Sequence, residues 1–496
     1  MKSEKGIFAQ TFDKYLKKKS MTVYDAAKLC NMDRMELYQM VQGQMLPQDW
    51  EQAGTIADML GMSPFERKNF LKAYEKNKIG EEIYYEQKYI LEFFEKLKFK
   101  EQKRNDDKKG ERLSEEKGRD SREIIYGKHS IDKFIYMLLE QQPKNSEIEI
   151  SLICQPEYEY LYRLLALYCE ELRLKICHII CLQESRKMEG KNYNLQSLLW
   201  MEPLITGDCD YQVHYYYDQR ESHFHNLNVF PYLIMIGNHI LQISADYQYA
   251  LYSSNQESKR LFQMLIADYL KETKPMFVMN PTPIETGELI VETTKNGLKT
   301  EIIITSAMDA LSIPMETVYE CMNKDAEGYE QAKEMSTFLR NRELKEIEDG
   351  IVKYKNFFTE EGLRRFLDTG HLEDPGGQIW KEYLEMADRM KILRNMNKQM
   401  EDGKIKRYMI RPNKILLPDN FFMSCMDQAA ISLLFQRQNK QWCFLLVYEK
   451  NLAESFYRFA STLNKTSMVY GRKETKNRIE KIIEEYQTYE ETEDKD

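Results

Sequence analysis

A highly charged stretch divides the chain into two parts that differ in hydrophobic periodicity. Between Lys98 and Glu123 the only large apolar residues are Phe99 and Leu113, a composition typical of a solvated linker. Before this stretch, apolar residues recur at spacings of three and four, which indicates helices throughout residues 7–79. After it, apolar runs alternate with helical patterns. The sequence therefore predicts a multidomain protein with an all-α N-terminal domain followed by a large mixed α/β region.

The α/β region begins with a strand–helix–strand pattern. Residues 147–155 and 174–182 read as strands, and the amphipathic segment 159–172 between them reads as a helix. A strand–helix–strand unit of this length favours a parallel pair of strands. No internal repeat is evident in the sequence.

Composition narrows the class of protein. Of the 496 residues, 42% are hydrophobic and 30% are charged, as in soluble globular proteins. No apolar run reaches the roughly 18 residues that a membrane span needs, and Gln10, Asp13 and Lys14 interrupt any signal-peptide core. The nine cysteines are scattered, which fits a reducing compartment. We expect a cytoplasmic protein without a membrane segment.

Two short patterns resemble metal-ligand spacings but lack the remaining ligands. Cys177 and Cys181 form the only close cysteine pair, and no second pair follows. His223 and His225 would share one face of a strand, again without acidic or cysteine partners at useful spacing. We predict buried free thiols and a surface or core histidine pair, with no metal site and no cofactor.

Charge is distributed unevenly along the chain. Residues 1–80 hold 13 Lys and Arg against 10 Asp and Glu, whereas the whole chain has a net charge of −9. An acidic body repels nucleic acid, so only the N-terminal part has the sign that favours binding it.

Residues 22–47 predict two short helices separated by only three residues, CNM. Helices so close in sequence cannot pack antiparallel and must cross at a steep angle. Asn31 suits the left-handed conformation that such a turn needs. Asp33 is placed to cap the second helix, with Glu36 completing a D-x-x-E capping box, and Gly43 ends that helix.

This segment resembles the lambda-repressor-like, or Xre-type, helix-turn-helix domains. The string DAAKLCNMDRMELYQMVQGQMLP follows the family's order of small helix, turn, recognition helix and glycine. The string AGTIADMLGMSPFERKNFLKAY is similar to its fourth and fifth helices. The resemblance covers about residues 7–75. It implies a recognition helix in the major groove of double-stranded DNA, and a homodimer that reads a two-part site.

The resemblance also implies which side chains meet DNA. Arg can bond guanine bidentately and Gln can bond adenine, and a lysine cluster at the end of the first helix can meet phosphates. The residues predicted to contact DNA are Arg34, Met35, Tyr38, Gln39 and Gln42 of the recognition helix, and Lys17 of the cluster.

Three departures from the family pattern leave an alternative open. Val23 stands where the family commonly has a phosphate-binding Gln, and Asp33 and Glu36 bring negative charge close to DNA. The alternative is a protein-interaction adaptor that uses a helix-turn-helix fold without binding DNA. The lysine cluster consists of Lys14, Lys17, Lys18 and Lys19, and isolated lysine runs of this kind are more commonly solvated faces.

A string in the α/β region resembles a second family, the phospholipase D superfamily, which uses H-x-K-x4-D. His239 and Asp246 have the required separation, and SSN at 253–255 echoes the turn that follows. Leu241, however, stands where the family has a lysine whose charge stabilises the phosphoryl transition state. We predict that the chain is not an enzyme. A degenerate phosphodiesterase-like fold, or simply two strands joined by GNH, remain the alternatives for this string.

The whole pattern predicts a sequence-specific, DNA-binding transcriptional regulator that senses a small-molecule or protein signal. The predicted parts are residues 1–80 (helix-turn-helix domain), 81–123 (helix and charged linker), 124–320 (α/β sensor or oligomerisation domain), 321–403 (helical segment) and 404–496 (small α/β domain).

Overall fold

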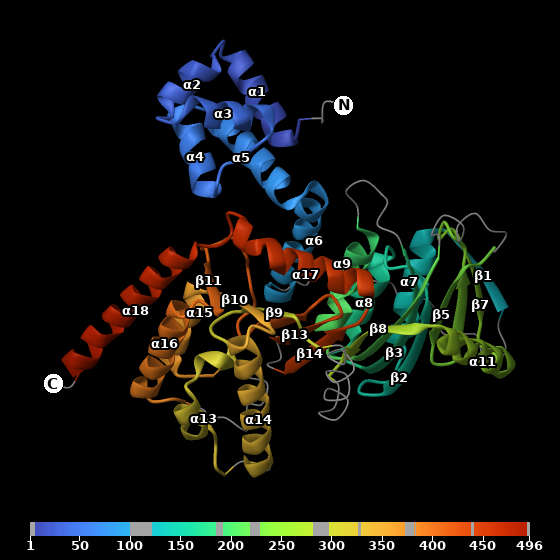
Figure 1. Cartoon of the computed structure of the whole chain (residues 1–496). Helices are drawn as coiled ribbons and strands as arrows, with labels where there is room; N and C mark the ends of the chain where they lie inside the picture. Colours follow the sequence, from blue (N-terminus) through green and yellow to red (C-terminus); the bar gives the residue numbers. More distant parts are fainter. Residues whose placement is uncertain are drawn as a thin grey trace.

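The computed structural model describes most of the chain and shows a helical N-terminal domain standing on a larger body (Figure 1). No helix in the part of the chain that it describes is long and apolar enough to cross a membrane. The described residues are 5–99, 122–184, 192–218, 229–280, 297–325, 329–372, 381, 383–437 and 441–493.

Five helices form the N-terminal domain around a core of their own. Phe8, Phe12 and Phe70 are its aromatic centre, with ring centroids 4.8 Å apart for Phe8–Phe70 and 5.1 Å for Phe12–Phe70. The Ser63–Glu66 capping box expected from the sequence starts the last helix. The helices are α1 (Ile7–Lys18), α2 (Val23–Leu29), α3 (Arg34–Gln42), α4 (Trp50–Met59) and α5 (Pro64–Ile79).

Helix α6 (Glu81–Lys98) belongs to the core of the body. Its Phe94 is fully buried among Phe421, Phe456 and Phe459, with ring centroids 5.1 to 6.2 Å away. Because the apolar face of α6 is covered in this way, the helix is anchored in the body and is not part of a solvated linker. The charged residues 100–121 that follow lie outside the described residues.

The body is built on one 14-stranded sheet, whose strand order is β1-β7-β6-β5-β2-β3-β4-β8-β14-β13-β12-β9-β10-β11. Its first half contains β1 (Arg122–Tyr126), α7 (Lys128–Glu140), β2 (Glu147–Ile153), α8 (Glu159–Tyr168), β3 (Arg173–Leu182), α9 (Tyr193–Thr206), β4 (Asp210–Tyr217), β5 (Tyr232–Ile236), β6 (His239–Ile243), β7 (Tyr249–Ser253) and α11 (Gln256–Glu272).

The second half begins at β8 and ends with a long C-terminal helix. It contains β8 (Lys274–Met279), β9 (Thr300–Thr305), the 3-10 turn η2 (Ala310–Ser312), α13 (Met315–Cys321), α14 (Tyr329–Glu348), β10 (Lys353–Thr359), α15 (Glu360–Thr369), α16 (Met386–Glu401), β11 (Ile405–Ile410), β12 (Phe422–Met426), β13 (Ala430–Gln436), β14 (Trp442–Val447), α17 (Lys450–Thr462), the 3-10 turn η3 (Leu463–Lys465) and α18 (Arg472–Glu493).

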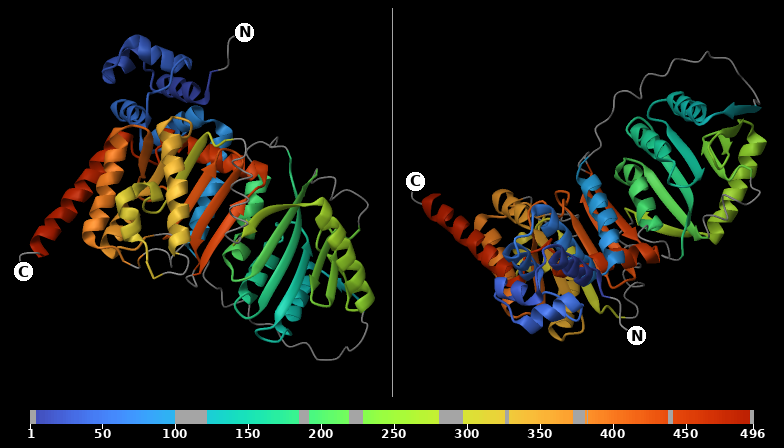
Figure 2. Two further views of the ribbon diagram at one scale, coloured as in Figure 1. Left: turned by 60° about the horizontal axis from the view of Figure 1, so that its bottom comes forward. Right: turned by 90° about the horizontal axis from the view of Figure 1, so that it is seen from above.

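The two halves repeat one strand topology, which the sequence does not reveal. In the first, β2, β3 and β4 run parallel, β5 pairs antiparallel with β2, β5-β6-β7 form a meander, and β1 pairs with β7. In the second, β9, β10 and β11 run parallel, β12 pairs antiparallel with β9, β12-β13-β14 form a meander, and β8 pairs with β14. Figure 2 shows the halves side by side, the first in cyan to green and the second in yellow to red.

The structure confirms the predicted fold class, an all-α N-terminal region followed by a large mixed α/β region. The predicted parallel pair is β2 and β3, joined by α8. The structure groups the later segments by the repeat: elements of 321–403 and 404–496 together build the second half of the sheet.

The burial of Phe94 predicts a large stability effect. Phe94→Ala should lower the free energy of unfolding of the body by about 3–5 kcal/mol, because it leaves a cavity among three aromatic rings. Glu92→Ala, on the exposed side of the same helix, is the matched control and should change stability by less than about 0.5 kcal/mol. Denaturant unfolding of the full chain measures both; equal effects would contradict the core position of α6.

Candidate nucleic-acid interface

The turn between α2 and α3 has the local geometry that the sequence predicts. Asn31 adopts the left-handed conformation with φ 50°, and Gly43 ends α3 with φ 78°. Asp33 caps α3, where its Oδ1 accepts hydrogen bonds from the backbone N–H of Met35 (2.8 Å) and of Glu36 (3.1 Å). The first turn of α3 is therefore held by the cap of Asp33.

The predicted capping box at Asp33 is wrong in its second half. The Asp33 carboxylate caps the helix, but the Glu36 side chain does not return to the Asp33 backbone. Complete boxes form instead at Thr22 with Asp25 and at Ser63 with Glu66. In both boxes the hydroxyl also donates to the carboxylate, at 2.5 Å and 2.9 Å. At Asp33 the capping side chain is a carboxylate, which has no proton to donate to the Glu36 carboxylate. The two negative charges repel each other, so the second bond of the box does not form.

Helix α3 turns apolar residues inward and most of the predicted DNA contacts outward. Its buried residues are Leu37, Met40 and Val41. Arg34, Met35 and Tyr38 are exposed, while Gln39 and Gln42 are half-buried. Within the described ranges the Arg34 guanidinium makes no hydrogen bond or ion pair, so its donors are available to a ligand. Contact of these side chains with DNA stays a prediction.

The lysine cluster at the end of α1 is only partly available. Lys17 pairs with Asp13 one turn earlier (2.7 Å), and Lys18 pairs with Glu66 at the start of α5 (2.7 Å). The Lys18 hydrogen bond is the main cause that lowers the pKa of Glu66 to about 2. Lys17 keeps an exposed side chain, and its pairing within an exposed helix is weak enough for a phosphate to compete with it.

The N-terminal domain contacts the body through α4 and α5. Glu51 of α4 forms an ion pair with Arg411, which follows β11. Glu75 of α5 is buried against the body; burial raises the pKa of its carboxyl, opposed by a hydrogen bond from the Ser467 backbone and by the charge of Lys414. In Figure 1, α2 lies at the far side of the domain from the body, and α3 lies between α2 and α4. Arg34, Met35 and Tyr38 leave α3 with an exposed face.

The structure separates the two polar residues of the phospholipase-D-like string along β6. His239 begins β6, where its Nδ1 lies 2.8 Å from the Tyr252 hydroxyl, and burial lowers the pKa of its imidazole. Asp246 lies beyond the other end of β6, where it accepts hydrogen bonds from Ser244 and from the Gln248 backbone in the turn to β7. Leu241 between them is fully buried. The two polar residues are held apart at opposite ends of the strand.

The two cysteines considered as metal ligands lie among the described residues, and neither forms a disulfide. Cys181 is buried and Cys177 half-buried, and burial raises the pKa of Cys177. Among the described residues no three His, Cys, Asp or Glu side chains are placed to hold a metal ion. His223 and His225 lie outside the described residues.

Two buried polar networks escape sequence reasoning. In the first half, the His178 Nδ1 lies 2.8 Å from the Tyr211 hydroxyl and burial lowers its pKa to about 4. In the second half, fully buried Arg407 bonds Asp309 (2.5 Å) and Asn356 (3.3 Å). Burial would raise the pKa of Asp309, but the Arg407 charge holds it below its usual value. Both networks lie within the packed body and connect neighbouring elements.

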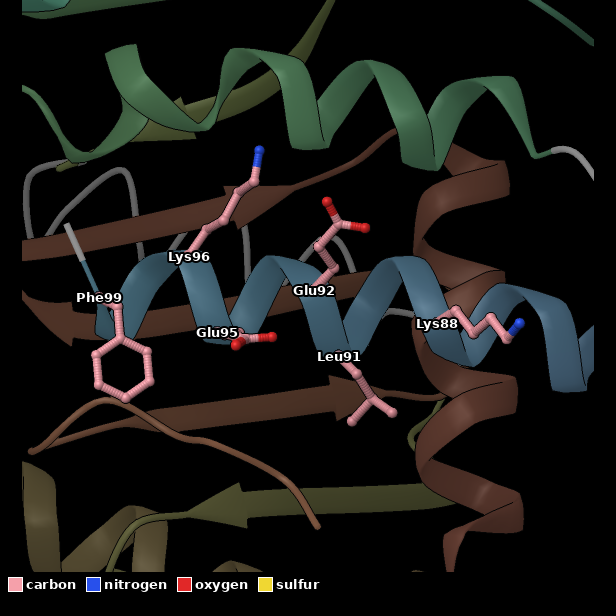
Figure 3. Close-up of a pocket in the computed structure, with 6 residues that line it drawn as sticks. All are labelled: Lys88, Leu91, Glu92, Glu95, Lys96 and Phe99. Atoms are coloured by element: carbon pink, nitrogen blue, oxygen red, sulfur yellow. The ribbon is translucent and has the colours of Figure 1, made fainter. Parts of the chain in front are cut away.

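An open pocket of about 610 Å³ runs beside α6. Figure 3 shows Glu92 and Lys96 pointing to one side of the helix and Leu91, Glu95 and Phe99 to the other. The set contains no histidine, cysteine or hydroxyl nucleophile, and its four charged residues are two lysines and two glutamates. The lining residues are Lys88, Leu91, Glu92, Glu95, Lys96 and Phe99.

Comparison with known proteins leaves the family of this chain open. No protein-family model matches it, and no curated protein matches its sequence. The archaeal chromatin protein TrmBL2, whose structure shows a novel mode of DNA binding, aligns at 11% identity over 42% of this chain and 70% of its own, with a TM-score of 0.20. Polyphosphate kinase from Porphyromonas gingivalis aligns at 10% identity over 66% of this chain and 47% of its own, with a TM-score of 0.19. Neither TM-score establishes a shared fold.

The cap of α3 predicts different effects for its two acidic residues. Asp33→Ala removes the acceptor for two backbone N–H groups and should lower the free energy of unfolding of the N-terminal domain by about 1 kcal/mol. Glu36→Ala removes no cap bond and should change it by less than about 0.5 kcal/mol. Thermal unfolding followed by circular dichroism measures both. A larger loss for Glu36→Ala than for Asp33→Ala would contradict this assignment.

Proposed function

We propose that this chain is a sequence-specific DNA-binding transcriptional regulator that reads duplex DNA with α3. The observation that carries the proposal is the exposed face of α3: Arg34 and Tyr38 project from its first turns, and the Arg34 guanidinium has no partner among the described residues. An α-helix with such a face fits the major groove, and a free guanidinium matches the two acceptors of guanine.

Two further observations support this role for the domain. Its ion pair and its buried carboxyl at the body come from α4 and α5, so binding at α3 requires no change in how the domain is seated. Lys17 at the end of α1 also keeps an exposed positive charge that a phosphate can meet. The body would then bind the small-molecule or protein signal. The ion pair between Arg411 of the body and Glu51 is the contact through which this binding would affect α4.

A protein-interaction adaptor is the second candidate, and a specific observation favours it. Four large apolar side chains are exposed on α2 and α3: Tyr24, Leu29, Met35 and Tyr38. Contiguous exposed apolar surface often marks protein interfaces. The adaptor and the DNA-binding proposals therefore compete for the same face.

Substitutions at Arg34 and Lys17 separate base contact from phosphate contact. Arg34→Ala should weaken binding to the selected DNA by about 1–3 kcal/mol and relax preference at one base pair. Lys17→Ala should weaken binding to all DNA sequences alike. It should also reduce the slope of log affinity against log salt concentration by about one unit. Fragments selected from the protein's own genome and scrambled DNA, titrated across a salt series, measure both effects.

Arg163→Ala is the matched control, because Arg163 is an exposed arginine of the body. It should leave DNA binding unchanged. Equal, weak binding of the wild type to both DNAs, unaffected by Arg34→Ala, would exclude DNA reading by α3 and favour the adaptor.

We further propose that the body does not hydrolyse phosphodiesters. Its string at His239 has a buried leucine where a lysine would stabilise the transition state, and Asp246 lies at the far end of the strand. Purified protein should therefore show no metal-independent turnover of a generic phosphodiester. Turnover that disappears in His239→Ala would contradict this proposal; turnover that persists in His239→Ala would point to a contaminating enzyme.

A further inference from the structure

The outer edge of β1 carries exposed apolar side chains. β1 pairs with β7 on one side and ends the sheet, with no strand of the described residues on its other side. Ile124 is 52% exposed and Tyr126 64% exposed, and both point to the same face because they are two residues apart. Tyr249, opposite Tyr126 on β7, is 49% exposed and its ring lies 6.1 Å away. Charge protects edge strands from pairing, and in β1 the charged residues are only the first two, Arg122 and Glu123. The last three residues are apolar, so this part of the edge can accept a partner.

The repeat within the chain shows what kind of partner such an edge accepts. β8 occupies the same position beside β14 that β1 occupies beside β7. The outer edge of β8 is paired antiparallel with β4. In the second half, the outer edge of β8 thus accepts an antiparallel strand. In the first half, no strand of the described residues pairs with the outer edge of β1.

At the opposite end of the sheet, the chain itself contacts the end of β11. Val469 forms an antiparallel bridge with Ile410 of β11. Around it, the Arg411 N–H donates to the Met468 carbonyl and the Tyr470 N–H donates to the Met409 carbonyl, both at 2.8 Å. Among the described residues, β1 has no such neighbour on its outer edge. A twofold contact, in which this edge meets the same edge of a second copy, closes with two copies.

We propose that two copies of the chain pair through β1, antiparallel, in a closed homodimer whose sheet continues across the twofold axis. The pairing register centred on Ile124 is the one in which all five residues of β1 find partners. It sets Ile124 against Ile124 of the second copy and covers the apolar face beside it. The interface does not depend on DNA binding, and it supplies the second copy that a two-part DNA site requires.

Sedimentation of the full chain without DNA tests the proposal. The wild type should sediment at twice the 59.3 kDa chain mass. Ile124→Lys sets two positive charges opposite each other, and should raise the dimer dissociation constant by about tenfold or more. Tyr126→Lys should weaken the dimer in the same direction. Ile351→Lys is the matched control: Ile351 is 59% exposed and precedes β10 in the second half, so it should leave the dimer intact.

A cysteine scan tests the register independently of stability. Ile124→Cys should form a cross-linked dimer under mild oxidation, because residues directly opposite in antiparallel strands have Cβ atoms about 4.5–5.5 Å apart. Tyr126→Cys should cross-link poorly, since it does not face itself. The wild type, whose nine cysteines are all buried or half-buried, provides the background.

Three results would overturn the proposal. The first is a wild-type monomer at every concentration. The second is a dimer that resists both lysine substitutions. The third is efficient cross-linking through Tyr126→Cys but not through Ile124→Cys. Since none of these measurements contains DNA, failure of the dimer and failure of the DNA-binding proposal are distinguishable.

Discussion

The antiparallel pairing of β4 with β8 turns two halves of seven strands each into one sheet. Val213 lies opposite Phe277, and Tyr215 opposite Lys274, with an irregularity after Val213. Val213 and Phe277 are buried in a hydrophobic core that runs through both halves. Without this pairing each half would expose a long, apolar edge, and exposed edges of that kind associate with other chains. The continuous sheet therefore depends on a single strand pair, whose two partners belong to different halves.

Helix α6 connects the N-terminal domain to both halves of the body. It packs against α9 of the first half and α17 of the second. The Glu86 carboxylate bonds Asn192 (2.8 Å), just before α9, and Arg458 (2.6 Å) on α17. Gly80, with φ 95°, lies between α5 and α6, a conformation that favours glycine. A shift between the halves would thus act on α6, which meets α5 at Gly80 and through the Lys76–Glu81 ion pair.

Local features of the fold were predictable, and those that depend on distant pairing were not. The Ser63 cap, the left-handed Asn31 and the parallel strands β2 and β3 each follow from a few adjacent residues. The repeat does not, because the halves share strand order and direction while their connecting helices differ in number and length. The capping box at Asp33 failed for a chemical reason that spacing alone does not express. The side chains of α3 could be assigned to its exposed face, but contact with DNA depends on a second molecule.

The distribution of charge along the chain limits where DNA could bind. Residues 81–496 hold 58 Lys and Arg against 70 Asp and Glu, so under the DNA-binding proposal the body would repel DNA and binding would depend on the N-terminal domain. The charge of Asp33 would have two opposite effects. It stabilises α3, the helix that carries Arg34, and it would repel DNA phosphates beside that helix. A neutral cap such as serine would relieve the repulsion and hold the helix nearly as well. Retaining aspartate lowers affinity for every sequence equally, since phosphates carry no sequence information. Under the DNA-binding proposal, the base contacts of α3 then make up a larger share of binding, and two copies of the domain are needed to hold one site firmly.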